Sequence, residues 1–173
     1  GRNKMEIEKA INTAVEYEVR VREVYVEALD EATDKVGRRI FKLLADEEDR
    51  HVKYLESKLA SWKEDGRLSA DDLDTAVPSA ELVQAEVAKL DKAMEPQDRS
   101  REVAMLEKAR EVEKETTDFY ARLVKDLPGE ASGFFKRFME IEQGHLEIVQ
   151  AEIDALNGLG YWFDMPEFNL ENG

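Results

Sequence analysis

Two short motifs contain both histidines of the chain. His51 follows Glu48 by three residues, and His145 follows Glu142 by the same interval. Positions i and i+3 lie on one face of a helix, so the two side chains of each pair could bind a common metal ion. One Glu-x-x-His pair is a weak signal because it arises often by chance. A chain that places both of its histidines in this motif gives a much more specific signal.

A further glutamate lies on the helical stretch that precedes each motif. Glu18 shares a stripe of apolar residues with Ile11, Ala14 and Val21, and Glu113 lies on a similar stripe. Apolar residues at this spacing face the core of a helical bundle, so these glutamates should point inward. The sequence therefore predicts a buried metal site with six ligands: Glu18, Glu48, His51, Glu113, Glu142 and His145.

Four carboxylates in a protein core need compensating positive charge. A buried ionised carboxylate is costly unless it is paired, and four of them near one another would repel and take up protons. No lysine or arginine recurs on these stripes at the level of the carboxylates. Two divalent cations would balance the four negative charges, and neutral imidazoles could complete their coordination. We therefore expect a two-metal centre.

Apolar spacing predicts the helices that would carry these residues. Short links join the first helix to the second and the third to the fourth, as between antiparallel neighbours. The crossover at residues 65–96 contains a further helical pattern at residues 79–94. Residues 158–173 are not helical in pattern, and we expect this aromatic tail to pack on the bundle or on a partner chain. The prediction is an all-α, antiparallel four-helix bundle at residues 1–157, with helices at Met5–Thr33, Lys35–Lys63, Gln97–Asp126 and Gly129–Asn157.

The two halves of this bundle repeat one another. A shift of 95 residues places the first predicted helix on the third and matches Glu18 with Glu113. A shift of 94 residues places the second helix on the fourth and matches His51 with His145. Internal repeats of this kind indicate similar structural units, so the two helix hairpins should pack about an approximate twofold axis.

Two tyrosines recur with the repeat. Tyr25 and Tyr120 each lie seven residues after the inward glutamate of their helix. They could be core aromatics, or phenols near the metals that hydrogen-bond a ligand carboxylate or pass an electron. The second reading makes them candidate catalytic residues.

Composition excludes several classes of function. The net charge of −15 argues against binding to nucleic acid or to an anionic membrane, because both need a cationic surface. The chain has no cysteine, which excludes disulfides, thiolate metal sites and cysteine nucleophiles. No apolar run is long enough to span a membrane, and no apolar targeting core is visible near residue 1, so we expect a cytoplasmic protein.

Four segments together resemble the ferritin-like di-iron carboxylate superfamily, and in particular rubrerythrin-type proteins without the rubredoxin domain. These segments are EYEVRVREVY (Glu16–Tyr25), LADEEDRH (Leu44–His51), EVEKETTDFY (Glu111–Tyr120) and MEIEQGH (Met139–His145). The resemblance implies a site for two iron ions, with manganese or a mixed manganese–iron pair as alternatives. It also implies bridging roles for Glu48 and Glu142, terminal roles for Glu18 and Glu113, and one metal for each of His51 and His145.

The sequence departs from this family pattern in three places. Thr116 stands where rubrerythrins carry an extra glutamate, and Glu115 could replace it only if the helix is locally rewound. Asp49 follows Glu48 where bacterioferritins have a haem-binding methionine, which argues against haem. Rubrerythrins proper also carry a cysteine-rich rubredoxin domain that delivers electrons, whereas these 173 residues contain no cysteine.

Three functions fit these observations. The first is a di-iron oxidoreductase that reduces peroxide or dioxygen with electrons from an external donor protein. The second is oxidation and storage of ferrous iron, and the third is a non-catalytic, metal-dependent bundle. We also expect a homodimer, in which two nearly symmetric hairpins could be exchanged between chains.

Overall fold

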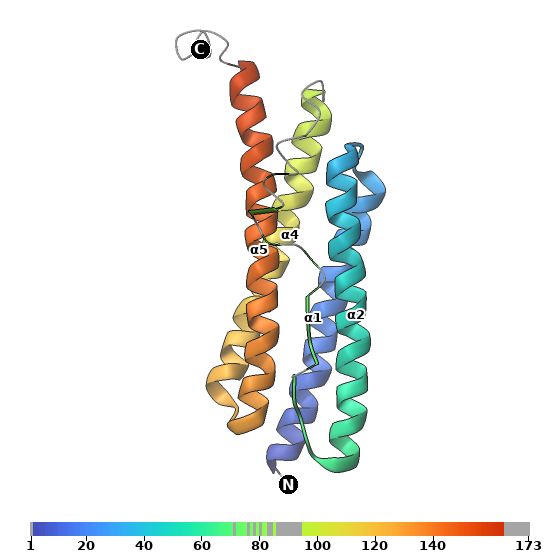
Figure 1. Cartoon of the computed structure of the whole chain (residues 1–173), viewed down its shortest axis with the longest axis vertical. Coiled ribbons are helices and arrows are strands. Elements are labelled where there is room, and N and C mark those ends of the chain that lie inside the picture. Colours follow the sequence, from blue (N-terminus) through green and yellow to red (C-terminus); the bar gives the residue numbers. More distant parts are fainter. Residues whose placement is uncertain are drawn as a thin grey trace.

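The computed structural model of the chain is a bundle of four long helices (Figure 1). It describes the backbone at residues 2–70, 72–75, 77, 79, 81–82, 85 and 95–164, and the side chains of those residues from 5 to 158. The all-α prediction is confirmed, since no strand occurs among these residues. No helix within the described ranges has the length and apolar character needed to cross a membrane. The helices are α1 (Arg2–Glu31), α2 (Lys35–Asp65), α4 (Pro96–Asp126) and α5 (Gly129–Asp164).

The predicted boundaries are correct to within a few residues except at the end of α5. The side chain of Asp34 accepts a hydrogen bond from Gly37 N (2.9 Å) and caps the start of α2, and Gly66 ends α2 in the left-handed conformation at φ 70°. The prediction that the last helix ends at Asn157 is wrong, because α5 continues to Asp164. Gly158 does not adopt a positive φ, so it lies within the helix and does not end it.

The predicted aromatic tail lies mostly outside the described part of the chain. Residues 158–164 belong to α5 and are helical, contrary to the prediction for the first part of the tail. Residues 165–173 and the side chains of 159–164 are outside the described residues. The expected packing of the tail therefore stays a prediction. The same holds for most of the helix predicted at residues 79–94, of which residues 81, 82 and 85 are described as helical.

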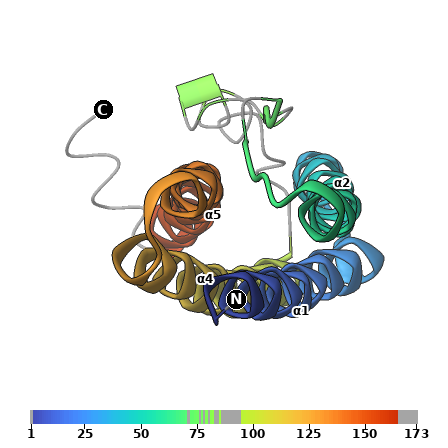
Figure 2. The same ribbon diagram turned by 90° about the horizontal axis from the view of Figure 1, so that it is seen from below.

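The helices form two antiparallel hairpins that meet along α1 and α4. Close backbone packing joins α1 to α2, α4 to α5, and α1 to α4. Seen along the bundle, the described part of the crossover that follows α2 lies over the side formed by α2 and α5 (Figure 2). Arg137 of α5 donates a hydrogen bond to the carbonyl of Leu73 in the crossover (3.0 Å), and Thr75 donates to Glu47 of α2 (2.7 Å). The crossover thus ties together the two helices that carry the histidines.

Two apolar clusters fill the bundle at different levels along its axis. One is mainly aliphatic and contains Tyr25, Phe41 and Leu106. The other is rich in aromatic side chains and contains Tyr120 and Phe138, whose rings lie 5.4 Å apart. The predicted ligands occupy positions between these clusters along the four helices. Apolar packing therefore isolates them from solvent in both directions along the bundle.

A second group of buried carboxyl groups lies about two and a half helical turns from the predicted ligands. Glu102 of α4 is 2% exposed and Glu152 of α5 is fully buried, and none of their carboxylate oxygens has a hydrogen-bond partner. Gly37 allows Glu102 to approach closely, because a Cβ atom at this position would lie 2.2 Å from Glu102 Oε1. Burial and the nearby charges of Asp34 and Asp98 raise the pKa of Glu102 from 4.5 to about 7. Glu102 therefore destabilises the fold whenever it is ionised.

Replacing Glu102 by glutamine should stabilise the protein at alkaline pH. Because the pKa of Glu102 is higher in the folded state, the folded protein binds more protons than the unfolded chain between about pH 4.5 and pH 7, and stability falls as the pH rises through this range. E102Q should raise the Tm by a few degrees at pH 8 and by less at pH 5, measured by thermal unfolding in the presence of chelator. The exposed Glu107 of the same helix provides the control E107Q. A Tm gain for E102Q that is equal at both pH values would contradict this account.

Candidate metal centre

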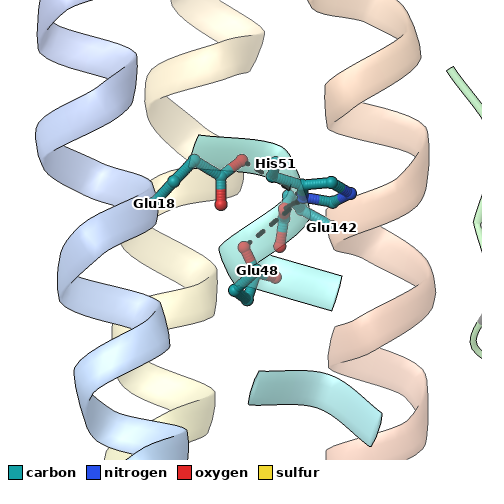
Figure 3. Close-up of side chains that lie close together, drawn as sticks. All are labelled: Glu18, Glu48, His51 and Glu142. Atoms are coloured by element: carbon teal, nitrogen blue, oxygen red, sulfur yellow. Dashed lines mark hydrogen bonds and ion pairs between the residues drawn. The ribbon is translucent and has the colours of Figure 1, made fainter. Parts of the chain in front are cut away.

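The six predicted ligands meet in the middle of the bundle. They form two groups whose potential ligand atoms lie within 4.8 Å of one another. The first group contains Glu18, Glu48, His51 and Glu142, and the second contains Glu48, Glu113, Glu142 and His145. Figure 3 shows the first group, to which α1, α2 and α5 contribute. All six residues are at most 2% exposed. The structure therefore places every predicted residue at one site.

The two groups share Glu48 and Glu142. The histidine rings are nearly parallel, with centroids 6.0 Å apart, and both direct Nδ1 toward the shared carboxylates. His51 Nδ1 lies 3.2 Å from Glu142 and 3.4 Å from Glu48. His145 Nδ1 lies 2.8 Å from Glu48 and 3.1 Å from Glu142. This arrangement suits two metal ions that share two carboxylates, with one imidazole for each ion.

Burial and crowding change the protonation of the carboxyl groups. Burial, and then the negative charge of Glu18, raise the pKa of Glu48 to about 8. Burial and Glu142 raise the pKa of Glu113 well above its ordinary value. Burial alone would also raise the pKa of Glu18, but its contacts with Glu48, His51 and Tyr120 lower this pKa to about 2. Protons therefore take the place of positive charge in the metal-free centre.

Burial and the neighbouring carboxylates act against each other on the pKa values of the two histidines. Burial disfavours their charged forms, but the surrounding carboxylates raise the pKa of both His51 and His145 well above 6.5. Several carboxylate oxygens have no hydrogen-bond partner, among them both oxygens of Glu48. The site thus offers carboxylate oxygens that are not committed to hydrogen bonds, next to two imidazoles, and this donor set fits iron or manganese. Divalent cations would displace the bound protons, so metal affinity should increase with pH.

Both predicted tyrosines hydrogen-bond to carboxylates of the site. Tyr25 donates its hydroxyl to Glu113 Oε1 (2.7 Å), and Tyr120 donates to Glu18 Oε1 (2.7 Å). Each tyrosine thereby orients the glutamate of the opposite hairpin. Both rings are also fully buried in the apolar clusters. Both tyrosines are therefore core aromatics that also contact a carboxylate of the cluster, while their catalytic role stays a prediction.

The sequence analysis did not identify Glu47, which contacts His145 on the edge of the ring that faces away from the cluster. Its carboxylate is 1% exposed and makes a close contact with His145 Nε2, the nitrogen opposite to the one that faces the cluster. Thr75 donates to both oxygens of Glu47 (2.7 and 2.9 Å). Burial would raise the pKa of Glu47, but His145 and Thr75 lower it to about 2, so this carboxylate is ionised. A signal was available, because Glu47 shares a helix face with Leu44 and His51.

Helix α4 provides no further carboxylate to the cluster. Glu115 is about half exposed and forms an ion pair with Arg20 (2.8 Å). Thr116 is buried but donates its hydroxyl to the carbonyl of Val112 within the helix (2.8 Å). The helix is not rewound at this point, so Glu115 does not reach the centre. Asp49 points outward and pairs with Arg22 and Lys53.

The E48Q variant should separate stability from metal binding. Because the pKa of Glu48 is raised to about 8 by burial and by Glu18, ionisation of this group destabilises the metal-free fold as the pH rises from about 4.5 through 8. Removing the ionisable group should raise the Tm of the chelated protein at pH 8 by several degrees. It should also remove most of the further increase in Tm that Fe²⁺ or Mn²⁺ gives the wild type.

The control for this experiment is E56Q, which changes an exposed glutamate of the same helix. Thermal unfolding of each variant at pH 8, with chelator and with metal, measures both effects. If E48Q gains as much from metal as the wild type, Glu48 is not part of a metal centre.

Comparison with known proteins gives one family. The family model of rubrerythrin matches residues 9–153, which include all of α2 and α4, most of α1 and α5, and every residue of the cluster. No curated protein and no solved structure matches the chain at the threshold applied.

Proposed function

Because the chain belongs to the rubrerythrin family, we propose that it is a di-iron oxidoreductase that reduces peroxide or dioxygen with electrons from an external donor. The observation that carries this proposal is the pair of buried four-residue groups that share Glu48 and Glu142. A structural ion-pair network would need as many cations as carboxylates at this level, and among the described residues the ion pairs of these four carboxylates involve only the two histidines. A two-metal centre accounts for the four carboxylates, the two imidazoles and their common position.

In this proposal each residue has a defined role toward the metals. Glu48 and Glu142 would contribute to holding both ions, since both belong to both groups. Glu18 and His51 would complete one position, while Glu113 and His145 would complete the other. We propose iron at both positions, with manganese or a mixed pair as the alternative, because the same oxygen and imidazole donors suit both metals.

When bound, two ferrous ions would supply the two electrons that, with two protons, convert hydrogen peroxide into two water molecules. The protein's part is to hold the ligands and to keep the site dry. Tyr25 and Tyr120 hold the terminal carboxylates of Glu113 and Glu18 by hydrogen bonds, which limits the positions these carboxylates can adopt. Their phenols also provide proton donors next to the carboxylates.

A cavity beside His145 supports a small oxidant. It has a volume of about 200 Å³ and lies between α5 and the crossover, with Thr75, Arg137 and Gly144 in its wall. Peroxide and dioxygen are small enough for such a space. The buried cluster itself offers no comparable room for a large organic substrate, because all six side chains are almost fully enclosed.

The electrons must come from outside the 173 residues. They contain no cysteine, so they cannot form a thiolate-bound iron centre that would deliver electrons within the chain. The proposal therefore includes a separate donor, a protein that carries its own redox centre.

Anaerobic loading with ferrous iron followed by peroxide tests the proposal. The wild type should bind two irons per chain and consume peroxide in a stopped-flow experiment faster than free ferrous ion does. E48A and H145A should lose metal and lose this reaction, because each removes a ligand from the shared centre. The control E56Q should behave as the wild type. Two bound irons without accelerated consumption of peroxide or dioxygen would refute the oxidoreductase and favour a non-catalytic metal-dependent bundle.

The main competing function is oxidation and storage of iron. It requires a hollow assembly of many subunits, whereas we propose a homodimer of about 40 kDa, twice the 19.8 kDa of the chain. Light scattering on the iron-loaded protein distinguishes the two. An assembly of many subunits that accumulates many irons per chain would support storage.

A further inference from the structure

The two halves of the site differ around the Nε2 atoms of the histidines, which face away from the cluster. The 94-residue shift that matches His51 with His145 also matches Glu47 with Ile141. Both residues are buried, at 1% and 4% exposure. One half of the repeat therefore has a carboxylate at a position where the other half has an apolar side chain.

This difference gives the two imidazoles different surroundings. Glu47 contacts His145 Nε2, and the Thr75 hydroxyl of the crossover donates its one hydrogen to the Glu47 carboxylate, within reach of both oxygens (2.7 and 2.9 Å). His51 Nε2 is buried and has no hydrogen-bond partner. The nitrogens that face the cluster are otherwise alike, since both Nδ1 atoms lie within 3.4 Å of Glu48 and Glu142.

From this asymmetry we infer that the two metal positions are unequal: the His145 position binds its ion first and more tightly, and Glu47 is the positioning residue responsible. This inference rests on the proposed two-metal centre and names the order in which its positions fill.

The physical reason lies in the tautomer of the imidazole. A histidine that binds a metal through Nδ1 must carry its proton on Nε2. At His145 the Glu47 carboxylate lies against Nε2 and accepts this Nε2–H, so the required tautomer and ring orientation are set before the metal arrives. At His51 the same tautomer would leave a buried N–H without an acceptor, which is costly. Removing such a supporting carboxylate typically reduces metal affinity by about 10- to 100-fold.

Titration of the metal-free protein with Co²⁺ tests the inference, because the visible absorption of bound cobalt reports occupancy without any turnover. The wild type should show two steps of unequal affinity. E47I, which makes the two halves alike, should weaken the tighter step by about 10- to 100-fold and leave the weaker step nearly unchanged. E47Q keeps the shape of the side chain, and T75V removes the hydroxyl that supports Glu47, together with the acceptor of a hydrogen bond from Val77 N (3.2 Å). Both should have a smaller effect in the same direction.

Two further variants assign the steps to positions. H51A should retain one tightly bound Co²⁺ per chain, and H145A should retain only weak binding. E56Q is the matched control for a glutamate change on α2, and circular dichroism of each metal-free variant confirms that it is folded. If E47I does not fold, E47Q and T75V still decide the question.

The outcomes separate this inference from the proposed function. Two Co²⁺ ions bound with equal affinity, or a tight step that E47I, E47Q and T75V leave unchanged, would overturn the inference and leave the metal centre in place. Tight binding that survives in H145A but not in H51A would also overturn it. A wild type that binds no Co²⁺, Fe²⁺ or Mn²⁺ would overturn the proposed function together with the inference.

Discussion

The structure depends on one costly feature, the burial of four carboxylates side by side in the core of a helical bundle. Glu18, Glu48, Glu113 and Glu142 are fully buried, and the only potentially cationic groups in the cluster are two histidines. Without metal, protons must neutralise this charge, which explains the raised pKa of Glu48 and of both imidazoles. The long helices and the two apolar clusters supply the packing that offsets this cost. The buried carboxylates thus lower the stability of the metal-free fold, as residues of a binding site often do.

The internal repeat explains both the regularity of the centre and its asymmetry. Two similar hairpins supply the same ligand set twice, and each tyrosine reaches across to the glutamate of the other hairpin. The surroundings have diverged, because Tyr120 packs among aromatic rings and Tyr25 lies in a mainly aliphatic cluster. Glu47 extends this divergence to the immediate surroundings of one histidine. Symmetric ligands in unsymmetric surroundings are expected to bind two ions unequally.

Much of this structure was predictable because its signals are local and repeated. The 3.6-residue periodicity gives the helices, and the doubled Glu-x-x-His motif with one partner glutamate per hairpin gives all six residues that meet. The end of α5 was not predictable from Gly158, since a glycine ends a helix only when it adopts a left-handed conformation, and this one does not. Glu47 was missed because comparison of the two halves emphasises what they share, and its counterpart Ile141 is apolar. Glu102 and Glu152 were also missed, because a glutamate on a helix is normally exposed and is rarely buried without a partner.

The crossover shows why a connecting segment can belong to a functional centre. Close backbone packing joins α2 to α1, α1 to α4 and α4 to α5, so α2 and α5 stand at the two ends of this row, and these are the helices that carry the histidines. The described part of the crossover after α2 lies over the side between them (Figure 2). There Thr75 donates a hydrogen bond to Glu47, and Leu73 accepts one from Arg137. The connection between two parallel helices must be long. Here its described residues support His145 through Glu47 and form part of the wall of the cavity beside His145. Changes in the crossover should affect the centre even though none of its described residues belongs to the metal-binding groups.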